Sequence, residues 1–127
     1  MTLDPLEAAR AIVGAGDSFG FVSWRRAAGI LTRQALEAAV ADLWAQVGYP
    51  EMNDVPISRQ LLALPYWRPG WELVGHDVRA AYDGLSAICH ASLYEVPPPP
   101  AQFLEWCDVV GRLRTKAARA TPTPLPA

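Results

Sequence analysis

The segment from about Phe21 to Val47 constrains the fold more than any other part of the chain, because apolar side chains recur through it at helical spacing. They cover roughly half the circumference of a helix, whereas a surface helix needs only one apolar stripe. The spacing therefore predicts a long helix that is packed on several sides, in the middle of a helical bundle. The apolar positions are Trp24, Ala28, Leu31, Ala35, Leu36, Ala39, Val40, Leu43 and Val47.

Further helices are predicted on either side of this segment, at about 5–13, 54–64, 71–93 and 101–119. Pro5 suits the first turn of the first of them, and Asp54 is a suitable N-cap for the second. The third carries an apolar seam of near-heptad spacing that runs from Trp71 to Cys89. The four prolines 97–100 form a stiff connector before the last helix.

No segment alternates apolar and polar residues as a half-buried strand would, and no internal repeat is present. The 51% apolar and 19% charged residues are typical of a globular chain. We therefore predict an all-α fold, an antiparallel bundle of four main helices plus a short N-terminal helix. A single domain covers residues 1–119, and the Pro- and Thr-rich residues 120–127 are expected to be disordered.

The first residues are acidic and lack the basic start of a signal peptide, and no apolar run approaches the ~20 residues that span a bilayer. We therefore expect a cytoplasmic protein that does not enter a membrane. In that compartment Cys89 and Cys107 remain reduced. Because Cys89 lies on the apolar seam and Cys107 has no adjacent histidine in the sequence, we expect both to be inert thiols.

One face of the predicted helix 71–93 is polar and carries His76, Arg79, Asp83 and His90. The two histidines are fourteen residues apart, roughly 21 Å at ~1.5 Å per residue, so they cannot bind the same metal ion within one chain. We therefore expect no metal and no cofactor. The face is interpreted either as solvated or as the contact between two copies in a two-fold dimer.

The corner "PYWRPGW" (65–71) places Trp67, Arg68 and Trp71 close together. Such residues either stack on bases or fill a partner's groove, or they plug the end of the bundle. The net charge of −2 gives no global attraction to nucleic acid, so RNA binding requires a local basic patch. The local positive charges lie at Arg25, Arg26 and Arg33, and at Arg112, Arg114, Lys116 and Arg119.

Three blocks of the chain, in order, resemble small bacterial HEPN-domain proteins. "WRRAAGILTRQALEAAVADLW" (24–44) is similar to their first core helix. "AAYDGLSAICHASLYEVPP" (80–98) is similar to the helix and turn around their active site, and "FLEWCDVVGRL" (103–113) to their closing helix. The resemblance implies an antiparallel helical bundle that forms homodimers. It also implies a metal-independent endoribonuclease, a toxin or antitoxin-controlled partner, or an inactive binding domain.

The family's ribonuclease motif is an arginine followed, after four to six residues, by a histidine. For His90 that arginine would stand at 83–85, which hold Asp83, Gly84 and Leu85. His76 lacks the arginine as well. The resemblance therefore points to a histidine whose catalytic partner is absent from its own chain.

These observations predict a non-catalytic HEPN-like module, a homodimer that binds a protein partner or RNA. The candidate binding residues are Trp67, Arg68, Trp71, His76 and Glu95. The alternative is an endoribonuclease that uses His90 in a dimer cleft, with Arg79 supplied in trans, Asp83 and Tyr94. A third hypothesis is an interaction protein of an unrelated helical family that uses the Trp67–Trp71 corner.

Overall fold

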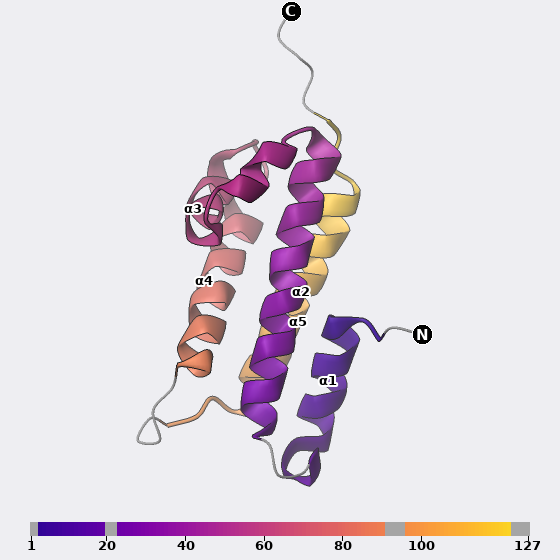
Figure 1. Cartoon of the computed structure of the whole chain (residues 1–127), viewed down its shortest axis with the longest axis vertical. Coiled ribbons are helices and arrows are strands. Elements are labelled where there is room, and N and C mark those ends of the chain that lie inside the picture. The colour runs from indigo at the N-terminus through magenta and orange to yellow at the C-terminus, as the bar shows by residue number, and fades with distance from the viewer. Residues whose placement is uncertain (1–2, 20–22, 91–95, 123–127) are drawn as a thin grey trace, which may run out of the picture.

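The computed structural model describes residues 3–19, 23–90 and 96–122, and its helices confirm the predicted all-α class (Figure 1). The described residues contain no β-strand. Short 3₁₀ turns flank the helices at Gly16–Phe19, Pro50–Asp54 and Leu64–Tyr66. The α-helices are α1 (Pro5–Ala15), α2 (Trp24–Val47), α3 (Ile57–Ala63), α4 (Glu72–Cys89) and α5 (Pro100–Ala118).

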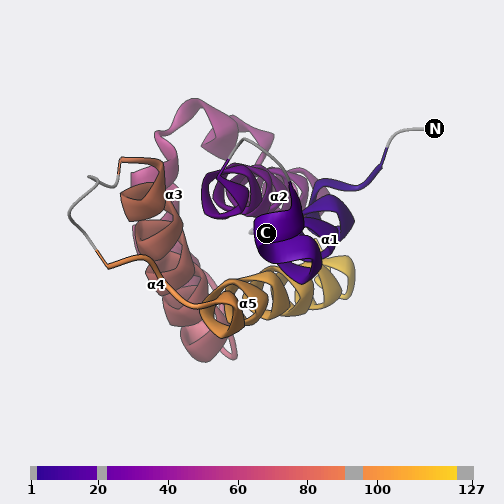
Figure 2. The ribbon, with the colours of Figure 1, turned by 90° about the horizontal axis from the view of Figure 1, so that it is seen from below.

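The helix α2 is the central element and runs along most of the molecule (Figure 1). It contacts α1, α4 and α5, and α4 and α5 also contact each other. The chain runs along α4 in the direction opposite to α2 and α5 (Figure 1). Seen from below, α1 lies against α2 and α5 on the side away from α4 (Figure 2).

The core confirms that α2 is packed on several sides. Of the nine apolar positions expected to face the core, all except the half-buried Leu31 are buried. One core cluster contains Leu36 and Leu43 of α2, Leu85 of α4 and Leu113 of α5, and none of the four is exposed to solvent. Each buried leucine of this kind contributes about 1.5–3 kcal/mol of hydrophobic stabilisation, so these three helices hold the fold together.

The segment expected to be a fourth main helix is shorter than predicted. Residues Pro50–Asp54 form a 3₁₀ turn, Pro56 rather than Asp54 is the N-cap, and α3 has only seven residues. Such a helix is roughly 10 Å long, too short to run beside α2. It lies at one end of the bundle instead, where Gln60 accepts a hydrogen bond of 3.0 Å from Trp44 Nε1.

The long helices end close to their predicted limits. Gly48 closes α2 with φ of 95°, a left-handed conformation that suits glycine. The helix α4 ends at Cys89 with His90 as its C-cap, and the remainder of the predicted helix (91–93) lies outside the described residues. After α5, Ala120 packs on the core and Thr121 accepts a hydrogen bond from Arg68, so contacts continue past residue 119.

Candidate functional site

The polar face of α4 does not assemble a site within one chain. The exposed side chains of this face include His76, Arg79, Asp83 and His90, which fits both a solvated face and a contact between two copies. Arg79 and His90 are eleven residues apart, roughly 16 Å along the axis. No ion pair forms between Arg79 and Asp83, although both are described. The remaining candidates of this group, Tyr94 and Glu95, lie outside the described residues.

His90 and His76 occupy opposite ends of α4. The backbone N–H of His90 donates to the carbonyl of Ala87, as expected of the C-cap residue that follows α4. The imidazole of His76 instead meets the ring of Tyr66 edge-on, with centroids 5.7 Å apart. Each histidine thus has a local structural role.

The corner between α3 and α4 packs against the end of the bundle, as one of the two interpretations of its aromatic residues predicts. Trp71 is only 3% exposed, and its ring lies 5.3 Å from that of the half-buried Trp67. The ring of Trp67 also meets Trp44 of α2 at 5.7 Å. The guanidinium of Arg68 covers Trp67 at 4.4 Å from the ring centroid.

The tight turn before α4 sets the position of this corner. Gly70 adopts a φ of 91°, which glycine tolerates because it has no Cβ. Its backbone N–H donates to a carboxylate oxygen of Glu72 at 3.0 Å, and Trp71 directly precedes the helix. The turn therefore directs Trp71 toward the core and leaves Arg68 beside the residues that follow α5.

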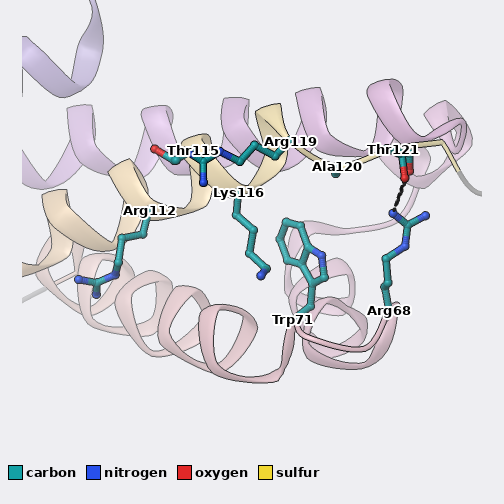
Figure 3. Close-up of a pocket in the computed structure, with 8 residues that line it drawn as sticks. All are labelled: Arg68, Trp71, Arg112, Thr115, Lys116, Arg119, Ala120 and Thr121. Atoms are coloured by element: carbon teal, nitrogen blue, oxygen red, sulfur yellow. Dashed lines mark hydrogen bonds between the residues drawn. The ribbon is translucent and has the colours of Figure 1, made fainter.

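A pocket of about 500 Å³ lies between this corner and the C-terminal half of α5 (Figure 3). Residues 112, 115, 116 and 119 of the chain share one face of the helical stretch that forms its wall, because they are three or four residues apart. Arg68 closes one end of the pocket with a hydrogen bond of 2.9 Å to the Thr121 carbonyl. The lining residues are Arg68, Trp71, Arg112, Thr115, Lys116, Arg119, Ala120 and Thr121.

The lining carries four cationic side chains and, among the described residues that form it, neither aspartate nor glutamate. Lys116 lies 5.3 Å from the centroid of the Trp71 ring. Arg112 and Arg119 are exposed and make no ion pair with a described residue. The pocket is therefore a concentrated positive region on a chain whose net charge is negative.

Arginine and lysine are common at helix C-termini because they compensate the exposed carbonyl groups, which would be a purely structural explanation for this cluster. Another residue satisfies some of those groups as well. The side-chain amide of Gln46 donates to the carbonyls of Ala117 and Ala118 in α5 and of Ala120 beyond it, at 2.8–3.2 Å. Because this amide is neutral, compensation of the helix dipole remains one role of the cations in the pocket.

Arg114 does not line the pocket, although the sequence places it among the other basic residues of α5. It forms two hydrogen bonds of 2.7 and 2.8 Å with the carboxylate of Asp4, on the α1 side of the molecule. These bonds raise the pKa of Arg114 and lower the pKa of Asp4. The spacing of Arg112, Lys116 and Arg119 on one helical face was the sequence signal for the pocket wall. Of the predicted binding residues of the corner, Arg68 and Trp71 line the pocket, and no sequence signal placed them beside α5.

The two cysteines differ in their surroundings. Cys107 has no exposed surface, its Sγ lies 3.6 Å from Thr32 Oγ1, and burial raises the pKa of its thiol. Cys89, expected on the buried seam, is partly exposed and lies beside the guanidinium of Arg33. Only Cys107 is therefore the buried thiol that the sequence predicts.

Within the part of the chain that the structure describes, no group of three potential ligands could hold a metal ion. No described helix is long and apolar enough to cross a membrane. Neither a family model nor a curated protein nor a solved structure matches the chain significantly.

The chemistry of the pocket is that of binding. Guanidinium and ammonium groups donate charge-assisted hydrogen bonds to anions, whereas the Thr115 hydroxyl already donates to the Gly111 carbonyl at 3.1 Å. The lining residues include no histidine, cysteine or carboxylate that could act as a general base. The arrangement can therefore hold an anion.

Proposed function

We propose that this protein is a non-catalytic, HEPN-like helical module that binds single-stranded RNA through the pocket between α5 and the 65–71 corner. The observation that carries the proposal is the convergence of Arg68, Arg112, Lys116 and Arg119 on one pocket whose lining contains no acidic residue. Because overall charge repels nucleic acid, a local patch of this kind is what RNA binding requires.

The side chains suit phosphate. Arginine binds phosphate oxygens with paired N–H groups, and lysine contributes a compact charge on a flexible stem. Arg112 to Arg119 spans seven residues, roughly 10 Å of helix at ~1.5 Å per residue. That length suits a few nucleotides of a single strand better than a rigid duplex, whose two phosphate rows need a broader surface.

The positions of the histidines support binding without cleavage. His90 and His76 do not line the pocket, and the arginine that the family motif requires is absent before both of them. Homodimerisation stays a prediction of the resemblance, which sedimentation of the purified protein tests directly.

The test is a titration of a fluorescent single-stranded RNA octamer, read by anisotropy. The wild type is compared with the double variant Arg112→Ala/Arg119→Ala and with the matched control Arg26→Ala/Arg59→Ala. All four arginines are exposed, and the control pair lies outside the pocket. We expect the pocket variant to lose about 10-fold or more in affinity, since each charge-assisted contact contributes about 1.5–3 kcal/mol when fully formed.

Salt dependence gives a second readout of the same contacts. With three phosphate contacts, the slope of log K against log salt concentration is expected near about −2, and it becomes shallower in the pocket variant. Equal losses in both double variants, or binding of poly-glutamate instead of RNA, would contradict the proposal. A parallel incubation of the RNA in EDTA tests the non-catalytic part, because cleavage by the wild type and not by His90→Ala would establish an endoribonuclease.

A further inference from the structure

Thr121 lines the pocket just after the end of α5. Its carbonyl accepts a hydrogen bond of 2.9 Å from Arg68, and its Oγ1 lies 3.5 Å from the same guanidinium nitrogen (Figure 3). The other hydroxyl of the lining, that of Thr115, donates to the Gly111 carbonyl within α5. Of the two hydroxyls, therefore, only that of Thr121 lies outside a helix.

The backbone around Thr121 is accessible to a modifying enzyme. Thr121 and Pro122 are exposed and belong to no helix. A proline disfavours the helical conformation in the residue before it and pushes that residue toward an extended backbone, which is the form in which a protein kinase binds its substrate segment. Ser58 is exposed as well, but it lies within α3.

A phosphate on Thr121 would match the charge of its surroundings. A phosphorylated side chain carries about −1.5 to −2 charges near neutral pH, and opposite a group of arginines it forms charge-assisted hydrogen bonds. Lys116 and Arg119 line the same pocket, and no acidic residue among the lining residues competes for them. Arg68 already bonds to Thr121, so the phosphate would strengthen an existing contact and does not require an unpartnered guanidinium.

We propose that Thr121 is a phosphorylation site and that its phosphate blocks the pocket against RNA. This inference rests on the proposed RNA-binding function and adds the regulation of the same site. A protein kinase would transfer the γ-phosphoryl group of a nucleoside triphosphate: the bond from the γ-phosphorus to its bridging oxygen breaks, a bond from phosphorus to Thr121 Oγ1 forms, and the hydroxyl proton passes to a base of the kinase. The products are the phosphothreonine, a nucleoside diphosphate and a proton.

Attachment to the chain gives this phosphate an advantage over RNA. Its contact with Lys116 and Arg119 is intramolecular, so its effective concentration at the pocket is about millimolar, whereas RNA must bind from solution. The added negative charge also weakens the local positive potential that attracts a strand. Phosphorylation is therefore expected to weaken RNA binding.

The first experiment measures the RNA affinity of three full-length preparations: the unmodified protein, the protein with phosphothreonine at 121 and the protein with phosphoserine at 58. Ser58 lies outside the pocket, so its phosphate controls for the added charge. We expect the phosphate at 121 to weaken binding of the fluorescent octamer about 10-fold or more, and the phosphate at 58 to weaken it less than about 3-fold. Equal effects of the two phosphates would overturn the proposal.

Phosphorus NMR gives a readout that needs no RNA. The second proton of a phosphate monoester has a pKa of about 6, and cations that contact the dianion lower that pKa. We expect a lower pKa of the phosphate at 121 in the folded protein than in the same protein unfolded in urea. The difference should largely disappear in Lys116→Gln/Arg119→Gln and persist in the control Arg26→Gln/Arg59→Gln. A pKa that does not change on unfolding would show that the phosphate does not occupy the pocket.

The modification itself is tested on the folded protein with a proline-directed threonine kinase and ATP. Thr123, which also precedes a proline, is replaced by alanine to leave one such site in this segment. Tandem mass spectrometry should locate one phosphate on Thr121, and the further substitution Thr121→Ala should abolish it. A reaction that leaves Thr121 unmodified would overturn the site.

The failures of the two proposals are distinguishable. If the unmodified protein binds no RNA, the proposed function is wrong, and the role of the phosphate as a block is wrong with it. If RNA binds and the phosphate at 121 leaves the affinity unchanged, the RNA-binding function stands and the regulation is wrong.

Discussion

The ammonium group of Lys116 lies 5.3 Å from the centroid of the Trp71 ring, so one contact joins the cationic pocket to the hydrophobic core. Trp71 is buried against the bundle while part of its surface forms a wall of the pocket. The ring quadrupole attracts the cation and restrains it at the pocket. The position of Lys116 therefore depends on the packing of the 65–71 corner.

Replacement of this lysine should affect ligand binding more than folding. In Lys116→Gln we expect a loss of about 0.5–1 kcal/mol of stability from the cation–π contact and about a 10-fold loss of RNA affinity. Urea unfolding and the anisotropy titration measure the two effects on the same preparation. A stability loss of several kcal/mol with unchanged affinity would assign Lys116 a structural role only.

The close approach of α4 to the corner predicts opposite effects for two glycine substitutions. A Cβ on Gly75 would lie 2.5 Å from the Cα of Pro65, so the backbone must move, whereas a Cβ on Gly14 in α1 meets nothing within 4 Å. We expect Gly75→Ala to lose about 1–3 kcal/mol and Gly14→Ala to gain about 0.5–1 kcal/mol, because alanine favours a helix over glycine. Thermal unfolding of both variants measures the two stability changes. An equal gain in stability in both variants would contradict the prediction.

The ion pair between Asp4 and Arg114 makes stability depend on pH. The hydrogen bond from Arg114 lowers the pKa of Asp4 in the folded state below its usual value of 3.8. Its contribution is therefore complete above the unfolded pKa and is lost as the pH falls through the folded pKa. We expect Asp4→Asn to cost about 0.5–1 kcal/mol at pH 7 and almost nothing near pH 2, as urea unfolding would show.

Asparagine is as good as aspartate at the N-cap of α1, so this substitution isolates the charge. Asp108→Asn is a suitable control, because the Asp108 side chain is 63% exposed and pairs with Arg10 at a longer distance, 3.3 Å. Equal losses at both positions, independent of pH, would contradict the assignment to the Asp4 pair.

The different burial of the two cysteines predicts selective labelling. A thiol reagent should modify the partly exposed Cys89 in the native protein, while Cys107 should react only as fast as the protein unfolds. Counting the released chromophore before and after denaturation, with Cys89→Ser as control, measures this. Rapid labelling of Cys89→Ser would show that the packing around Cys107 opens in the native state.

Helical periodicity accounts for what could be predicted of the fold. The recurrence of apolar residues through α2 and the seam from Trp71 to Cys89 indicated which faces are buried, although Val74 and Cys89 of the seam are only half-buried. The length of α3 could not be predicted, because Asp54 and Pro56 both suit the start of a helix. The backbone instead formed a 3₁₀ turn in which Val55 N–H bonds to Met52, and that choice depends on packing against the end of α2.

The candidate site was only partly predictable for a similar reason. Arg112, Lys116 and Arg119 share a helical face, which spacing alone reveals. Arg114 lies between them in sequence, yet its partner Asp4 is 110 residues away, and no local pattern connects the two. Likewise, only the folded chain brings Arg68 to Thr121.

By itself, the sequence determined the helical class, the buried faces of the long helices and the presence of basic residues on α5, because these follow from local periodicity and residue type. The tertiary structure alone decided which cations share a pocket and which are neutralised. Those outcomes depend on long-range packing: the turn at Gly70 sets Trp71 against the core, and Asp4 pairs with Arg114 on the side of the molecule away from the pocket.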